Sequence, residues 1–306
     1  MFSLLPEIAR YPTYQILVAM VLALLLAIVL FPVWIRLLKF RNIGQQVRAD
    51  GPQGHLVKQG TPTMGGVLIL LVVSLVYLSL GEVGRAGVIS LVALLGCGML
   101  GFIDDYAKVM KARSLGLTAK MKIAGQAVVA STVGVLAVNW AHVSPEVVIP
   151  FVGTIDLGVW QSSVSVGGFS LELPWLYLGL VFFMVLSFSN TVNLTDGLDG
   201  LAAGTVMIVM LAFVAIAFAQ DNLELALFAA AVAGACLGFL WYNSYPADIF
   251  MGDTGSLGLG AVIAALAVVT KTELLAPILG GIYVAEGLSV ILQVTSFKLT
   301  GKRIFR

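Results

Sequence analysis

Three short polar segments contain the residues of this chain that are best suited to chemistry. They are IDDYAK (Ile103–Lys108), NTVNLTDGLDG (Asn190–Gly200) and NSYPADIFMGDTGS (Asn243–Ser256), and together they hold six of the sixteen acidic residues. Each segment lies at the end of a long apolar run. Carboxylates at the ends of membrane helices are costly to desolvate and are rarely present for packing alone. If the three segments meet on one side of a membrane, they predict an acidic, amide-rich pocket for a metal ion and a phosphorylated ligand.

The first segment offers two adjacent carboxylates and a lysine. Asp104 and Lys108 are four residues apart and share a helix face, whereas Asp105 points to a different face. One acid can therefore meet a metal ion while its neighbour meets a proton or a hydroxyl group. An ordinary interfacial ion pair is the alternative interpretation.

The second segment places polar side chains on one face of a helix end. Asn190, Asn193 and Asp196 recur every three residues, and two glycines then allow a tight turn around Asp199. Asparagine and aspartate side chains can bond the edge of a nucleobase or the hydroxyl groups of a sugar. A plain helix-terminating loop is the alternative.

The third segment is a turn of small residues around an acid. Gly252 and Gly255 flank Asp253 at the start of an apolar run, where backbone amides can approach a diphosphate and a helix N-terminus favours anions. Phe250 can stack on a base, although an apolar anchor explains a single aromatic residue equally well.

The amino-acid composition indicates which kind of structural element must position these three polar segments. Hydrophobic residues make up 59% of the 306 residues, charged residues 11%, and the mean hydropathy is +1.02. These values are far from the globular norm of about 25% charged residues and predict an all-α polytopic membrane protein. The net charge is only +1 and the basic residues are dispersed, so nucleic acid is not an expected partner.

Nine apolar runs approach the length of about 20 residues that a membrane span needs. With nine spans and the N-terminus outside, fourteen Lys and Arg residues face the cytoplasm and three lie outside, whereas omission of the short eighth run gives eleven and six. The positive-inside rule therefore favours nine spans, with all three acidic segments on the cytoplasmic face. The predicted spans are 14–38, 64–80, 86–103, 123–140, 173–189, 201–219, 225–242, 257–270 and 275–296.

The chain is predicted to form one membrane domain, 1–306, whose external and cytoplasmic loops differ in composition. The external loop 141–172 lacks Lys and Arg and contains two β-like runs, Val147–Phe151 and Ser163–Leu171, which predict a small hairpin. The cytoplasmic loops predicted to build the active site are 42–63, 104–122, 190–200 and 243–256.

An acid in the predicted ninth span admits two interpretations. Glu286 shares a helix face with Ser289 and Gln293, so it is either functional or part of a hydrogen-bonded contact between helices. An ion-coupled transporter is the non-enzyme alternative for the whole chain. Transporters place coupling residues near the bilayer midplane, often within paired repeats. Here the polar groups gather at one surface and no repeat is visible.

Five motifs in order resemble the phospho-N-acetylmuramoyl-pentapeptide transferases of bacterial peptidoglycan synthesis. The motifs are GTPTMGG, IDDYAK, NTVNLTDGLDGLAAG, the NSYPADIFMGDTGS stretch and the closing SVILQVTSFKLTGKRIFR. Polyprenyl-phosphate N-acetylhexosamine 1-phosphate transferases share the DD and MGD elements and are the alternative, but GTPTMGG and NLTDGLDGLA are more similar to the muramoyl branch.

The resemblance implies a reaction, a cofactor and a location. Phospho-MurNAc-pentapeptide would pass from its UDP form to undecaprenyl phosphate, giving lipid I and UMP, with Mg²⁺, in the bacterial inner membrane. A homodimer is a further expectation. The family continues into a histidine-rich motif and a tenth span, whereas this sequence stops at Arg306.

The resemblance also implies roles for individual residues. Asp253 would be the Mg²⁺ ligand, and Asp104 and Asp105 the essential acid pair, one of which deprotonates or orients the lipid phosphate. Polar positions of the site would be Asn190, Asn193, Asp196 and Asp199. Positions around the uridine would be Gly197, Leu198, Asn243 and Phe250. Positions near the phosphates would be Lys58, Thr63, Lys108 and Lys120.

Overall fold

The computed structural model describes residues 11–41, 43–44, 60–80, 83–110, 116–166, 168–302 and 304. Lys58 lies outside these residues. The described chain is dominated by helices, with α1 (Pro12–Phe40), α2 (Gly65–Ser79), α3 (Arg85–Met110), α4 (Ala119–Asn139) and α5 (Trp175–Thr195) in its first part. The second part contains α6 (Leu201–Ala219), α7 (Leu223–Asn243), α8 (Gly252–Val269), the short α9 (Ala276–Leu279) and α10 (Gly281–Thr300).

Among the described residues, eight helices are long and apolar enough to cross a membrane: α1, α3, α4, α5, α6, α7, α8 and α10. The ninth apolar helix, α2, has 15 residues and spans about 22 Å, less than the hydrocarbon core of about 30 Å. The expected fold class, an all-α polytopic membrane protein, is confirmed. The side of the membrane that each loop faces stays a prediction.

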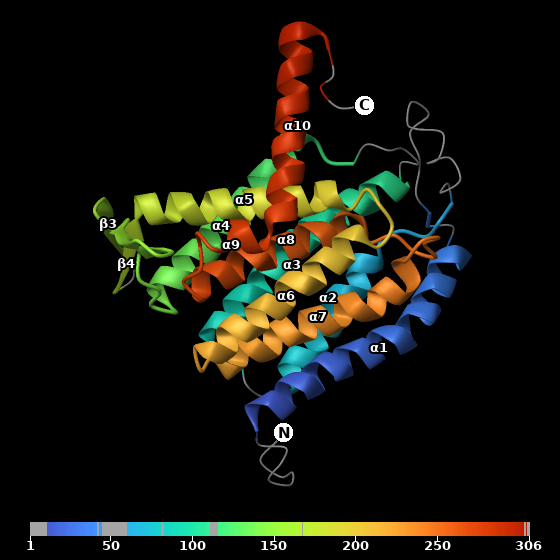
Figure 1. Ribbon diagram of the computed structural model, residues 1–306, viewed down its shortest axis with the longest axis horizontal. Coiled ribbons are helices and arrows are strands. Elements are labelled where there is room, and N and C mark those ends of the chain that lie inside the picture. Colours follow the sequence, from blue (N-terminus) through green and yellow to red (C-terminus); the bar gives the residue numbers. More distant parts are fainter. Residues whose placement is uncertain are drawn as a thin grey trace.

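The two most enclosed helices form the centre of the bundle. Helix α8 packs between α3 and α5, and α7 packs against α1 and α6 (Figure 1). The side chains of α8 are buried almost along its whole length, because Gly and Ala make up much of it and allow close approach. On α7, the GxxxG pair Gly234 and Gly238 lies directly against the backbone of α1, as expected for close helix packing.

The last predicted span differs from a single helix. The run 275–296 is divided at Gly280–Gly281 into the four-residue α9 and the long α10. Helix α10 leaves the bundle at a steep angle and projects beyond it (Figure 1), with most of its apolar side chains exposed. Consecutive glycines interrupt the helix at the bend because neither contributes side-chain packing to hold it straight.

The loop between α4 and α5 contains two hairpins instead of one. Strand β1 (Glu146–Ile149) pairs with β2 (Gly153–Asp156), and β3 (Gln161–Val166) pairs with β4 (Phe169–Pro174), both antiparallel. The run 163–171, which we expected to be one strand, includes the turn between β3 and β4. Gly168, which has φ +88°, lies between the two strands and allows the chain to reverse.

Candidate active site

Three carboxylates from two helices converge at one end of the bundle. Asp104 and Asp105 come from α3, and Asp253 lies in the first turn of α8. One oxygen from each lies within 4.8 Å of the others. The acids lie within helices, whereas we predicted loops over 104–122 and 243–256. Helix α3 continues to Met110 and α8 already begins at Gly252, because buried polar contacts hold these helix ends together.

Asp105 caps the helix that carries Asp253. Its Oδ1 accepts a hydrogen bond from the Asp253 amide at 3.1 Å, and its Oδ2 accepts from the amide and the hydroxyl group of Thr254 at 2.9 and 2.8 Å. The first amides of a helix have no partner within that helix, so an acceptor from α3 satisfies them. Gly252 has φ +77°, and a Cβ there would lie 2.7 Å from Asp105 Oδ2, so the cap requires glycine.

Asp104 is enclosed between a loop and two lysines. Its Oδ1 accepts from the Leu117 amide at 2.6 Å, and its Oδ2 lies 2.6 Å from Lys108 Nζ and 3.1 Å from Lys122 Nζ. The residue has no exposed surface. This buried carboxylate is stabilised by a hydrogen bond on Oδ1 and by ion pairs with two lysines on Oδ2.

Asp253 is the accessible member of the three, with 14% of its side chain exposed. Its Oδ1 accepts from Asn193 Nδ2 at 3.0 Å and lies 3.2 Å from Lys108 Nζ, while its Oδ2 lies 2.5 Å from Lys122 Nζ. Asn193 also donates to Ser256 Oγ at 2.7 Å, which fixes the amide between α5 and α8.

The lysine that contacts the acids from α4 is Lys122. The resemblance had directed attention to Lys120, but the Lys120 side chain is exposed, and the ammonium group at the cluster belongs to Lys122. Lys122 is four residues before Gln126, a buried polar residue, so the two share an inward-facing stripe of α4.

Asn193 contacts the acid cluster, whereas Asn190 belongs to a hydrogen-bond network between two helices. Asn190 Nδ2 donates to Gln126 Oε1 at 3.0 Å, and Gln126 donates to Ser189 Oγ at 2.8 Å, so this network joins α4 to α5. Both Asn190 and Asn193 belong to α5, which extends to Thr195, whereas we predicted a loop from 190. Helical hydrogen bonding therefore continues through this polar segment.

Asn243 joins the loop after α5 to the loop after α7, and both loops border the acids. Its Oδ1 accepts from the Gly200 amide at 3.0 Å, and its Nδ2 donates to the Ile249 carbonyl at 2.9 Å. Asp199 Oδ2 accepts from the Ala247 amide at 3.2 Å in the same region. Gly197 and Leu198 are exposed at the edge of this region, with 61% of Leu198 accessible.

The GTPTMGG segment is joined to the Phe250 loop through backbone groups. The Phe250 amide donates to the Pro62 carbonyl at 2.8 Å, the Gly65 amide to the Phe250 carbonyl at 2.9 Å, and the Gly66 amide to the Met251 carbonyl at 2.8 Å. Thr63 lies beside Gly252, where its Oγ1 would be 3.2 Å from an added Cβ. Thr63 therefore lies close to Asp105 at the Gly252 turn, and Phe250 lies two residues before that turn.

The cluster has an excess of negative charge. Three carboxylates face two ammonium groups, so one negative charge remains when all are ionised. A fourth acid, Asp196, lies nearby just after α5. Burial, followed by the charges of Asp253 and Asp105, raises the pKa of Asp196 well above its usual value. Hard carboxylate oxygens with surplus negative charge are suited to Mg²⁺, so the donor set fits this ion.

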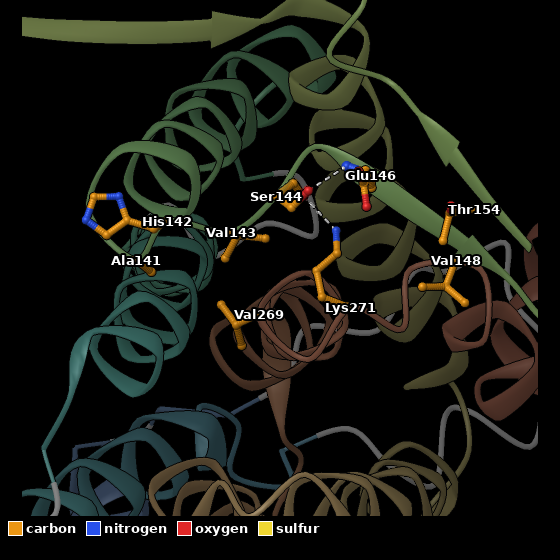
Figure 2. Close-up of a pocket in the computed structure, with 9 residues that line it drawn as sticks. All are labelled: Ala141, His142, Val143, Ser144, Glu146, Val148, Thr154, Val269 and Lys271. Carbon is orange, nitrogen blue, oxygen red and sulfur yellow. Dashed lines mark hydrogen bonds between the residues drawn. The ribbon is translucent and has the colours of Figure 1, made fainter.

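A separate pocket lies at the opposite end of α8. Figure 2 shows its lining, in which Lys271 donates from Nζ to the Ser144 carbonyl at 2.8 Å. Lys271 also pairs with the buried Glu273 at 2.7 Å. Since α8 rises about 1.5 Å per residue over 18 residues, this pocket is roughly 25 Å from Asp253 and is distinct from the acid cluster.

The fold and the cluster define a polytopic membrane enzyme with a carboxylate–lysine site at one end of a helical bundle. Comparisons with known proteins agree. The family model described as glycosyl transferase family 4 matches residues 87–271, and a model described as phospho-N-acetylmuramoyl-pentapeptide-transferase signature 1 matches residues 58–70.

Curated relatives match nearly the whole chain. Phospho-N-acetylmuramoyl-pentapeptide-transferases are similar at 44% identity in Shouchella clausii (96% of this chain, 86% of the relative) and at 45% in Bacillus subtilis (95% and 86%). One from Heliobacterium modesticaldum is 48% identical (96% and 85%). The chain belongs to the phospho-N-acetylmuramoyl-pentapeptide transferases of glycosyl transferase family 4, and it is a phospho-sugar transferase.

Proposed function

We propose that this protein transfers phospho-MurNAc-pentapeptide from UDP-MurNAc-pentapeptide to undecaprenyl phosphate, with Mg²⁺, in the bacterial inner membrane. The products would be lipid I and UMP. The observation that carries this proposal is the convergence of Asp104, Asp105 and Asp253 with two lysines at the end of a bundle. Phosphoryl transfer needs fixed cations and positioned acids more than covalent chemistry, and this site supplies both.

Asp253 is the proposed metal-binding residue, because it is the most accessible carboxylate and two neighbours hold its orientation. Asp105 fixes its backbone, and Asn193 holds its Oδ1. A bound Mg²⁺ would neutralise phosphate oxygens and stabilise charge in the transition state.

The remaining polar groups divide between the lipid phosphate and the nucleotide. Asp104 is held by Lys108 and Lys122, so deprotonation or orientation of the lipid phosphate by Asp104 requires these lysines to move toward phosphate oxygens. Lys108 and Thr63 are proposed to meet phosphates, since Lys108 contacts all three acids and Thr63 lies beside Gly252. A contribution from Lys58 and Lys120 and a homodimeric assembly stay predictions.

The uridine is proposed to lie against Phe250, between the loops that Asn243 joins. The exposed surface of Gly197 and Leu198 and the carboxylate of Asp199 would complete the nucleotide contact. Asn190 and Asp196 would act from behind this surface, Asn190 through its network with α4 and Asp196 as a buried acid whose raised pKa favours its protonated form.

Exchange of labelled UMP into UDP-MurNAc-pentapeptide tests the proposal. One phosphoanhydride is broken and another is formed, so little free energy separates the two sides, and each 1.4 kcal/mol changes the ratio only about tenfold. UMP should therefore remove phospho-sugar from the lipid product when Mg²⁺ is present. A lipid product that is stable to excess UMP, with active enzyme and metal, would contradict the assignment. Acceptance of UDP-N-acetylhexosamine instead would identify the sister activity.

A further inference from the structure

Two ammonium groups lie among the carboxylates, where a bound cation would interact with the same oxygens. Lys108 Nζ contacts all three acids, at 2.6 Å from Asp104, 3.5 Å from Asp105 and 3.2 Å from Asp253. Lys122 Nζ contacts only two of them, at 3.1 Å from Asp104 and 2.5 Å from Asp253. A divalent cation that enters this cluster must therefore compete with lysine.

The two oxygens of Asp253 differ in how they are held. Oδ1 accepts from Asn193 and faces Lys108, so two neighbours fix it. Oδ2 is paired with Lys122 at the shortest ion-pair distance in the cluster. Like charges repel strongly at the few ångströms that separate ligands of one oxygen. A cation on Oδ2 would therefore displace the ammonium group of Lys122.

Once a cation binds Asp253, Lys108 and Lys122 keep different contacts. Lys108 keeps its shortest contact, to Asp104 on its own helix. Lys122 loses its shortest contact and keeps only the one to Asp104 at 3.1 Å. It also lies near the N-terminus of α4, whose first turn contains no acid and whose dipole disfavours a positive charge. The released ammonium group therefore requires a new anion.

We propose that Lys122 is the counterion of the metal-free site and that the entering divalent cation releases it to bind the phosphate oxygens of the nucleotide substrate. This inference rests on the proposed function for the identity of the anion. The exchange of lysine for metal rests on the contacts alone. Lys122 would thus hold the carboxylates in place before metal binding and contact the diphosphate afterwards.

Binding of Mn²⁺ to the purified full chain in detergent, without substrate, tests the exchange. Lys122→Gln should bind Mn²⁺ about tenfold more tightly than the parent, the change that 1.4 kcal/mol produces. Lys120→Gln removes the same charge from the same helix at an exposed position and should leave the Mn²⁺ affinity at the parent value. Lys122→Arg keeps the charge and should also bind as the parent does. Equal or weaker Mn²⁺ binding by Lys122→Gln would overturn the proposal.

A second measurement on the parent protein needs no substitution. Amine-selective acetylation, followed by mass spectrometry, should modify Lys122 several-fold faster when Mg²⁺ is present, while the rate at Lys120 stays constant. A rate at Lys122 that does not change under conditions where the metal binds would also overturn the exchange.

Nucleotide binding then tests the second role. With saturating Mg²⁺, the affinity of Lys122→Gln for UDP-MurNAc-pentapeptide should fall at least tenfold, and Lys122→Arg should restore most of it. An unchanged affinity would overturn the phosphate contact. A parent that exchanges metal for lysine but transfers no phospho-sugar would refute the proposed function and leave the exchange intact.

Discussion

The Asp105 carboxylate accepts a hydrogen bond from the backbone amide of Asp253, so one acid of the cluster holds the helix that presents another. The adjacent acids of α3 are therefore not equivalent. Asp105 is saturated by the N-terminus of α8, whereas Asp104 faces the lysines. Each member of the pair can be tested separately.

Asp105→Asn should destabilise the protein as well as impair it. Asn keeps only one acceptor oxygen, so its NH2 group would face either the Asp253 amide or the two Thr254 donors and could not accept from them. Leaving a buried group unpaired costs about 1–3 kcal/mol. Thermal unfolding in detergent, compared with the parent, measures this loss. Parent-like stability together with lost transfer would show that Asp105 acts as a reactive group and that its capping contacts are dispensable.

Asp253→Asn should abolish turnover and also lower stability, because Lys108 and Lys122 lose one of their carboxylate partners. Asn keeps the shape and can still accept from Asn193, but it lacks the charge that a divalent cation requires. Loss of several kcal/mol of metal stabilisation predicts at least about a hundredfold lower kcat. UMP exchange across a Mg²⁺ titration checks this. Near-normal exchange and metal dependence would move the metal to Asp104 and Asp105.

Phe250→Ala should weaken nucleotide binding and spare the lipid substrate. Stacking of a base on an aromatic side chain contributes about 1–3 kcal/mol, which predicts a loss of about one to two decades in affinity. Direct binding of UDP-MurNAc-pentapeptide to folded protein measures this loss. An affinity equal to the parent's would remove Phe250 from the nucleotide site.

Asp196→Asn should stabilise the protein increasingly as pH rises. The pKa of Asp196 is raised in the folded state by burial and by neighbouring acids, so the folded state binds the proton more tightly than the unfolded state. The parent is therefore not penalised at pH values below the unfolded pKa, about 3.9, and loses stability as pH rises above it. Asn carries no such penalty. The difference in Tm between variant and parent should be smallest near pH 4 and larger at pH 7, and a constant difference would contradict this explanation.

The all-α membrane fold could be predicted from the sequence because the apolar runs are long and unambiguous. The ends of the helices could not be predicted, because polar residues near a helix end resemble those of a loop. Asn193 and Asp253 lie within helices because tertiary contacts between α3, α5 and α8 support them there. The glycine pair at which the last span divides is visible in the sequence, but the projection of α10 away from the bundle is a tertiary feature that no local pattern states.

The candidate site was predictable as a set of acids and amides, because their spacing on a helix face is visible in the sequence. Their contacts were not. Lys122 is one of several lysines in a polar segment, and only the packing of α4 against α3 selects it over Lys120. Likewise, nothing in the sequence distinguishes the capping role of Asp105 from the ion-pairing role of Asp104.

Three main-chain hydrogen bonds join the loop that presents Phe250 to the GTPTMGG segment. Every residue except proline offers the same amide and carbonyl, so these three hydrogen bonds do not depend on which side chain occupies position 250. Exchanging that side chain would alter the surface offered to a nucleotide while the frame around Gly65 and Gly66 stays in place. Under the proposed function, position 250 is therefore a place in this fold where an engineer, or natural variation, could change the choice of base without rebuilding the acid cluster.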